Sequence, residues 1–181
     1  MSTPSPSPGR VLAISVAVCL GVAVVQTWGA WTSSVPVLVG GGMEPDWTGT
    51  AWAWWWTWEA LLQGANPVAG GWNLWPVGHA PVAQYNLVDA SVLGWAIHVL
   101  GPTRGYNLGC LLTLASTGVA GARLARVAGA SWKPSLVGGL ALQCSSYLAC
   151  EVSQGRVGQA LIAFLVLAFA EIVRLSRGEG T

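Results

Sequence analysis

The stretch that decides the fold is Glu44-Pro45-Asp46-Trp47-Thr48-Gly49-Thr50-Ala51-Trp52-Ala53-Trp54-Trp55-Trp56-Thr57-Trp58-Glu59. It opens a block, residues 44–100, that carries nine of the twelve tryptophans in the chain. An indole ring joins an apolar body to a donor N–H, so tryptophan favours the boundary between membrane and water. The block therefore predicts a loop lying on a bilayer, with hydrophobic spans on either side.

The composition around this block is that of a membrane protein. Charged residues make up only 8% of the chain and hydrophobic residues 53%, with a mean hydropathy of +0.54, whereas ordinary soluble domains carry about 25% charged residues. The net charge of +1 and the lack of a basic cluster exclude a nucleic-acid-binding surface. The four cysteines form no Cys-x-x-Cys pair, which favours packing roles over a metal site or disulfide.

Four apolar segments are predicted to cross the membrane, since about 20 apolar residues span a bilayer core. They are residues 11–31, 105–122, 134–150 and 157–173. The first also resembles a signal peptide, but its length favours an uncleaved span. Residues 1–9 are predicted to be a disordered Pro/Ser tail, residues 10–175 a single membrane domain, and residues 176–181 a second tail.

Basic residues near the span ends predict the orientation of the chain. With the N-terminus in the cytoplasm and four spans, six of the eight basic residues lie inside, namely Arg10, Arg123, Arg126, Lys133, Arg174 and Arg177. Arg104 and Arg156 then lie outside, as does the loop 32–104. A crossing by residues 87–100 would weaken this bias, so that segment is predicted to be an interfacial or re-entrant helix.

The tryptophan-rich segment, residues 48–62, is predicted to be a helix. Thr48 or Thr50 is suited to cap its start, and Gly64 to stop it. Two stripes follow at helical spacing, one of Trp47, Trp54 and Trp58 and the other of Trp52 and Trp56. Such a helix either lies in the headgroup layer or packs beneath the spans. No strand pattern is present, so the predicted fold is an all-α polytopic membrane protein, with about four transmembrane helices and a long outer loop bearing interfacial helices.

Acidic residues in the outer loop are the first candidates for chemistry. Asp46 follows the first span closely, and Glu44 lies two residues before it. A carboxylate here can act as a general base, share a divalent cation with its neighbour, or simply be solvated or cap the helix. Asp46 and Glu44 are therefore the candidate catalytic pair, and the identity of any metal stays open.

Four further residues are candidates for binding a substrate. His79 is held among turn residues, Asp89 either caps an apolar helix or faces a site, and Arg104 and Arg156 are outer cations able to meet a phosphate. Arg156 has the alternative of pairing with Glu151. The chain has no Gly-rich phosphate loop and no Gly-x-Ser-x-Gly motif.

The order of short motifs resembles the N-terminal part of GT-C-type membrane glycosyltransferases over about residues 10–175. The motifs are Glu44-x-Asp46 after the first span, Gly64-Ala65-Asn66-Pro67, Trp75-Pro76-Val77-Gly78, Asn86-Leu87-x-Asp89, Gly101-Pro102, Tyr106-Asn107-Leu108 and Gly121-Ala122-Arg123-Leu124-Ala125-Arg126.

The resemblance implies a function, a location and a set of roles. A sugar would pass from a polyprenyl-phosphate donor to an acceptor at the extracytoplasmic face of a bacterial inner membrane. Asp46 would be the catalytic acid or base, with Glu44 as its companion. Members of the family have more spans than the four predicted here, so the chain would be a module completed by further helices or by a membrane partner. The alternative is a non-enzymatic subunit that binds a larger membrane protein through the tryptophan-rich loop.

Overall fold

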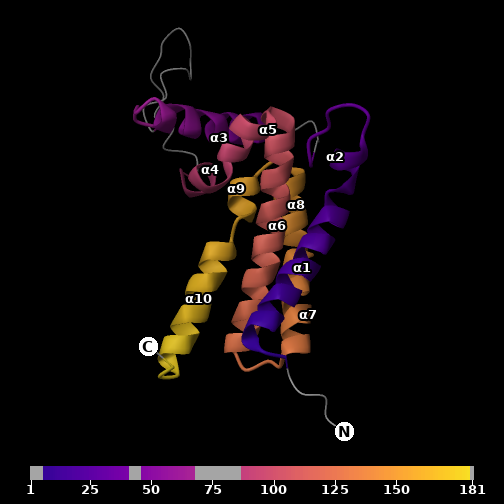
Figure 1. The fold of residues 1–181 in the computed structure, drawn as a ribbon, viewed down its shortest axis with the longest axis vertical. Helices are drawn as coiled ribbons and strands as arrows, with labels where there is room; N and C mark the ends of the chain where they lie inside the picture. Colours follow the sequence, from indigo (N-terminus) through magenta and orange to yellow (C-terminus); the bar gives the residue numbers. More distant parts are fainter. Residues whose placement is uncertain (1–5, 41–45, 68–86, 180–181) are drawn as a thin grey trace. The chain divides into compact units, whose positions relative to one another are not determined.

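The computed structural model describes residues 6–40, 46–67 and 87–179. These described residues are helical, with no strand among them (Figure 1). The helices are α1 (Pro8–Gln26), α2 (Trp28–Thr32), α3 (Asp46–Leu62), α4 (Leu87–Leu93), α5 (Trp95–Leu100), α6 (Pro102–Val127), α7 (Trp132–Gln143), α8 (Ser146–Ser153), α9 (Val157–Ala160) and α10 (Ala163–Ser176). The prediction of an all-α fold is confirmed for this part of the chain.

The chain divides into two compact units. Unit 1 comprises Met1–Trp28, Leu111–Cys150 and Ala160–Thr181, and unit 2 comprises Gly29–Cys110 and Glu151–Gln159. All six basic residues predicted to be cytoplasmic belong to unit 1, and both predicted outer cations belong to unit 2. The two stretches predicted to lie on the outer side therefore gather in one unit.

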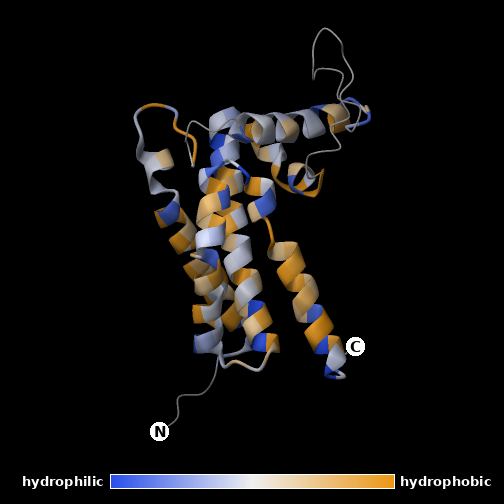
Figure 2. Cartoon of the chain, turned by 180° about the vertical axis from the view of Figure 1, so that it is seen from behind, coloured by the Kyte–Doolittle hydropathy of each residue, from blue (hydrophilic) through white to orange (hydrophobic). Residues whose placement is uncertain are grey.

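Three helical segments are long and apolar enough to cross a membrane. They are Pro8–Gln26, Pro102–Val127 and Val157–Ser176, the last counted through the short break between α9 and α10. Figure 2 shows α10 as hydrophobic along most of its length, with hydrophilic residues near the C-terminal end. These segments coincide with three of the four predicted spans.

The remaining predicted span, residues 134–150, is not one continuous helix. It is divided into α7 and α8 at Cys144 and Ser145. The polar run from Gln143 to Ser146 explains the break, because the Gln143 side chain turns inward to bond another helix and Ser145 Oγ accepts from the Leu148 N–H at 3.4 Å. A count of apolar residues cannot detect such a break.

Two N-terminal boundaries also differ from the prediction. Helix α1 begins at Pro8, so Pro8 and Gly9 are helical and not part of a tail. The first apolar run then breaks at Thr27, between α1 and α2, where Thr27 Oγ1 donates to the Ala23 carbonyl at 2.8 Å. Proline is tolerated in the first turn of a helix, because the N–H group that it lacks would have no partner within the helix there.

Unit 1 is built around the C-terminal part of α6, which packs beside α1, α7 and α10 (Figure 1). A Cβ added at Gly118 would approach Cys19 Sγ of α1 to 2.9 Å, and one added at Gly121 would approach the Gly139 Cα of α7 to 3.2 Å. The buried Gln143 donates to the Cys19 carbonyl at 3.0 Å and to Gln26 Oε1 at 3.1 Å. Small residues thus permit close helix contact, and one amide ties α7 to α1.

Unit 2 is built around α3, which packs against α4 and α5. The Trp54 ring is 1% exposed and lies 5.8 Å from the Tyr106 ring, measured between centroids. Trp52 and Trp56 stack at 6.1 Å, which confirms the second tryptophan stripe. The tryptophan helix therefore buries part of its indole surface inside its own unit.

Both ends of α3 test a prediction. The predicted stop is confirmed, because Gly64 has φ +66° and the Ala65 N–H donates to the Ala60 carbonyl at 2.7 Å, the bond pattern of a helix ending in a left-handed glycine. The predicted start is wrong. The helix begins at Asp46, so Thr48 and Thr50 lie inside its first turns.

The predicted interfacial helix, residues 87–100, is two helices, α4 and α5, that meet at Gly94. A Cβ at Gly94 would lie 2.5 Å from the Trp54 carbonyl oxygen and 2.6 Å from Trp58 Cδ1. The bend therefore occurs where this segment lies close against α3. The segment is apolar but shorter than the helices that are long enough to cross a membrane.

Candidate functional site

Asp46 and Arg156 form an ion pair in unit 2. Asp46 is the first residue of α3, and Arg156 lies in the link between α8 and α9. Arg156 Nε donates to Asp46 Oδ2 at 2.7 Å across 110 positions of sequence, and both side chains are a little over 40% exposed. The structure thus joins the predicted catalytic acid to a predicted phosphate-binding cation, in a pair that solvent can reach.

The backbone beside the pair fixes its position. Gly155 has φ +77°, and a Cβ there would lie 2.5 Å from the Trp47 nitrogen and 2.7 Å from its Cα. Thr50 Oγ1 donates to the Gly155 carbonyl at 2.9 Å. The link before Arg156 therefore lies directly on the first turns of α3, and only glycine fits that approach. Thr50, predicted as a cap, instead holds this link.

Asp89 belongs to α4 and contacts α3 at a place separate from the Asp46–Arg156 pair. It lies in the first turn of α4, is 4% exposed, and accepts a hydrogen bond from Trp54 Nε1 at 2.8 Å through Oδ2. Its Oδ1 has no hydrogen-bond partner among the residues that the structure describes. Trp54 follows Asp46 by eight residues, about 12 Å along the helix axis at the usual rise, so Asp89 does not join the Asp46–Arg156 pair.

Burial shifts the pKa of Asp89. Removal from water raises the pKa of this carboxyl above its ordinary value, and the bonds from the Trp54 indole and the Ala90 amide oppose that shift only in part. Burial thus acts against the charged form of this carboxyl. Because Asp89 is buried and bonded to Trp54, it fits a structural role better than contact with a substrate.

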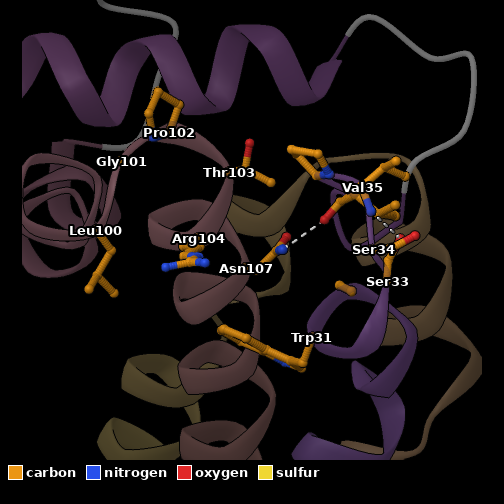
Figure 3. Close-up of a pocket in the computed structure, with 13 residues that line it drawn as sticks. Trp31, Ser33, Ser34, Val35, Leu100, Gly101, Pro102, Thr103, Arg104 and Asn107 are labelled. Atoms are coloured by element: carbon orange, nitrogen blue, oxygen red, sulfur yellow. Dashed lines mark hydrogen bonds between the residues drawn. The ribbon is translucent and has the colours of Figure 1, made fainter.

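A pocket of about 370 Å³ forms around the start of α6 (Figure 3). Arg104, Thr103, Ser33 and Ser34 give it hydrogen-bonding groups, and its apolar surface comes from residues such as Trp31, Val35 and Leu100. Arg104 is exposed and makes no hydrogen bond or ion pair with the described residues. The pocket can therefore accommodate an anion that carries an apolar group.

Asn107 closes this pocket and was not predicted as a site residue. Its Oδ1 accepts from the Val39 N–H at 2.9 Å, and its Nδ2 donates to the Val37 carbonyl at 2.8 Å, a bond drawn in Figure 3. Both polar ends of the amide thus hold segment 33–39 against α6. An asparagine at the start of an apolar run was the available signal, because a buried amide needs partners.

The other candidates complete the comparison with the sequence. Glu44 and His79 lie outside the described residues. His98 of α5 was not predicted as a site residue. Its Nε2 lies 3.3 Å from the Trp55 carbonyl oxygen and 3.9 Å from a Glu59 oxygen, so it packs against α3. Within the described ranges, no group of three or more His, Cys, Asp or Glu side chains is placed to hold a metal ion.

Comparisons with protein-family models, with curated proteins and with solved structures found no match to this chain. The functional argument therefore depends on the residues of unit 2 and their geometry.

Proposed function

We propose that this chain is a GT-C-like module of a membrane glycosyltransferase, which transfers a sugar from a polyprenyl-phosphate donor to an acceptor at the extracytoplasmic face. The observation that carries the proposal is the contact between Asp46 and Arg156. A carboxylate suited to accept a proton and a guanidinium suited to bind a phosphate come together from distant parts of the sequence.

Each partner has one role in the proposed transfer. Arg156 holds Asp46 Oδ2, which leaves Oδ1 to take the proton of the acceptor hydroxyl. The hydroxyl oxygen forms a bond to the anomeric carbon of the sugar as the bond from that carbon to the phosphate oxygen breaks. The electron pair of the broken bond stays on the phosphate, whose charge Arg156 offsets.

The pocket around Arg104 supports an amphiphilic donor. Its hydroxyl and guanidinium groups suit a phosphate, whereas Trp31, Val35 and Leu100 suit the first isoprene units. Three membrane-length helices in the same chain suit a donor that resides in the bilayer. A divalent cation, where one binds, would use Asp46 with Glu44, and no step proposed here passes through it.

The charge distribution supports the proposed orientation in a bacterial inner membrane, with the N-terminus in the cytoplasm and the loop 32–104 outside. Unit 1 holds six of the eight basic residues, whereas unit 2 holds five of the seven acidic residues, which are Glu44, Asp46, Glu59, Asp89 and Glu151. Basic residues are retained on the cytoplasmic side during insertion. Cysteine labelling from outside intact cells, at exposed Thr48 of unit 2 and at Lys133 of unit 1, tests the assignment.

The catalytic proposal is tested by Asp46→Asn in membranes that contain the intact system and a radiolabelled lipid-linked sugar. Loss of the proton acceptor is expected to lower transfer by about 10²–10⁴-fold, with insertion unchanged. Glu59→Gln is the matched control, because it removes a carboxylate from the other end of the same helix. Full transfer by the Asp46→Asn protein would end the catalytic claim.

A second candidate function is a non-enzymatic subunit that binds a larger membrane protein. It is favoured by an apolar stripe on α4 and α5 formed by Val88, Val92, Trp95 and Val99, which are 37–70% exposed. Co-purification separates the two functions. A stable partner without turnover of a lipid-linked sugar supports the subunit, whereas turnover that requires Asp46 supports the enzyme.

A further inference from the structure

A groove of about 340 Å³ runs between the first half of α1 and the C-terminal half of α6, entirely within unit 1. Its wall is mainly apolar, formed by Val11, Leu12, Val119 and Ala122. Arg123 and Arg126 line the same groove. It therefore combines a hydrocarbon surface with two cations.

The side of the groove formed by α1 is open because small or outward-facing residues line it. A Cβ added at Gly9 would meet nothing within 4 Å, and Leu12 is 56% exposed. The Ser15 hydroxyl donates a hydrogen bond to the Val11 carbonyl at 3.0 Å, so it presents little polarity to the groove. An acyl chain can lie along this wall without displacing a side chain.

The two guanidiniums retain capacity for an anion. Arg123 pairs with Glu171 of α10 at 2.5 Å, and Glu171 also pairs with Arg174 at 2.8 Å. Arg126 donates from Nη1 to the Ala130 carbonyl at 2.9 Å. Each guanidinium has five N–H donors, so these contacts use only part of either. Glu171 is shared by Arg123 and Arg174, and Arg126 pairs with no carboxylate among the described residues, so positive charge is in excess here.

We infer that this groove binds an anionic phospholipid, with one acyl chain along Val11, Leu12 and Val119 and the phosphate at Arg123 and Arg126. The charge of the two arginines selects an anionic headgroup over a zwitterionic one. The helices that form the groove are of membrane length, so lipid is the medium that surrounds them. Basic pockets between transmembrane helices are suited to such headgroups. The inference does not depend on the proposed transferase activity.

Native mass spectrometry of the full chain in detergent tests the inference, with phosphatidylglycerol and phosphatidylcholine of identical acyl chains as probes. We expect phosphatidylglycerol to bind about ten-fold more tightly or better, as two arginines near an anionic lipid predict. The double variant Arg123→Gln and Arg126→Gln is expected to reduce this preference to two-fold or less. Lys133→Gln is the matched control, because it removes one cation of unit 1 that does not line the groove.

A second variant covers the case in which the double variant does not fold. Val119→Phe keeps both arginines and fills the apolar part of the groove, so it should weaken binding of phosphatidylglycerol at least five-fold with the helix content unchanged. Equal affinity for the two lipids in the wild-type protein would overturn the inference. So would an equal loss of preference in the Lys133→Gln control, or occupation of the groove by a second copy of the chain, seen as a dimer that excludes lipid.

Discussion

Unit 1 and unit 2 use the same helical secondary structure in opposite ways. Unit 1 consists largely of long apolar segments that meet through small residues, and a few amides and arginines fix their pairing. Unit 2 consists of shorter helices joined by indole rings, a buried carboxyl and an ion pair. The length and hydropathy of the helices therefore determine the structure of unit 1, whereas individual side-chain contacts determine the structure of unit 2. Unit 2 should accordingly be the more sensitive to single substitutions.

The largest expected effect is that of Trp54→Ala in unit 2. The ring is almost fully buried and packs over Gly109 and Tyr106, so its loss should cost about 3–5 kcal/mol. Hydrogen exchange in detergent should show lost protection in α3, α4 and α5 with α7 still protected. Trp55→Ala, at a residue 37% exposed, is the control. An equal loss of protection in α7 would show that the effect is not confined to unit 2.

Asp89 gives the next effect, which depends on pH. Asp89→Leu leaves the Trp54 N–H without an acceptor and should cost about 1–3 kcal/mol. The pKa of Asp89 is raised in the folded protein, so its contribution to stability is complete below its ordinary pKa and is lost as pH rises through the raised value. Thermal unfolding of the wild type should shift upward on acidification relative to Asp89→Asn. Parallel pH profiles of the two proteins would contradict a raised pKa for Asp89.

Gln143 provides the corresponding test in unit 1. Gln143→Leu removes the bonds to the Cys19 carbonyl and to Gln26, and a hydrogen bond between membrane helices contributes about 1 kcal/mol. We expect a lower unfolding midpoint in detergent with the fold retained. Ser116→Ala is the control, because Ser116 bonds only locally to the Thr113 carbonyl among the contacts described. A cost as large as that of Trp54→Ala would remove the contrast between the units.

The smallest expected effect on stability is that of the Asp46–Arg156 pair. Both side chains are over 40% exposed, so a double-mutant cycle with Asp46→Asn and Arg156→Gln should give a coupling of about 0.2–1 kcal/mol. The coupling should shrink between about 0.1 M and 1 M salt, as the Debye length falls from roughly 10 Å to 3 Å. A coupling large enough to maintain the fold would point to a structural pair. A small coupling beside a large loss of transfer supports a site.

The sequence predicted what depends on composition and spacing. Three apolar helices of membrane length, the tryptophan helix and its stop at Gly64 agree with the prediction, because apolar length and helical period act locally. The break at Ser145 was not predicted, because it depends on where the Gln143 side chain bonds. The start of α3 was misplaced because Thr50 has a distant partner in Gly155.

The candidate site was predicted residue by residue but not as an arrangement. Asp46 and Arg156 were each selected because charged residues are rare in this hydrophobic chain. No local sequence pattern relates two positions that are 110 residues apart. Asp89 was identified too, but its bond to Trp54 required the packing of α4 on α3. Asn107 was missed because its role is to hold backbone groups of another segment.

Gly155 has a consequence for how this protein can vary. Its left-handed backbone and its closeness to the Trp47 main chain each exclude a side chain independently. Relieving one restriction leaves the other, so no compensating change elsewhere readily rescues a substitution. In a library covering every amino acid at each position, only glycine should be recovered at position 155. The neighbouring Arg156 should tolerate substitutions that change its chemistry but not the fold.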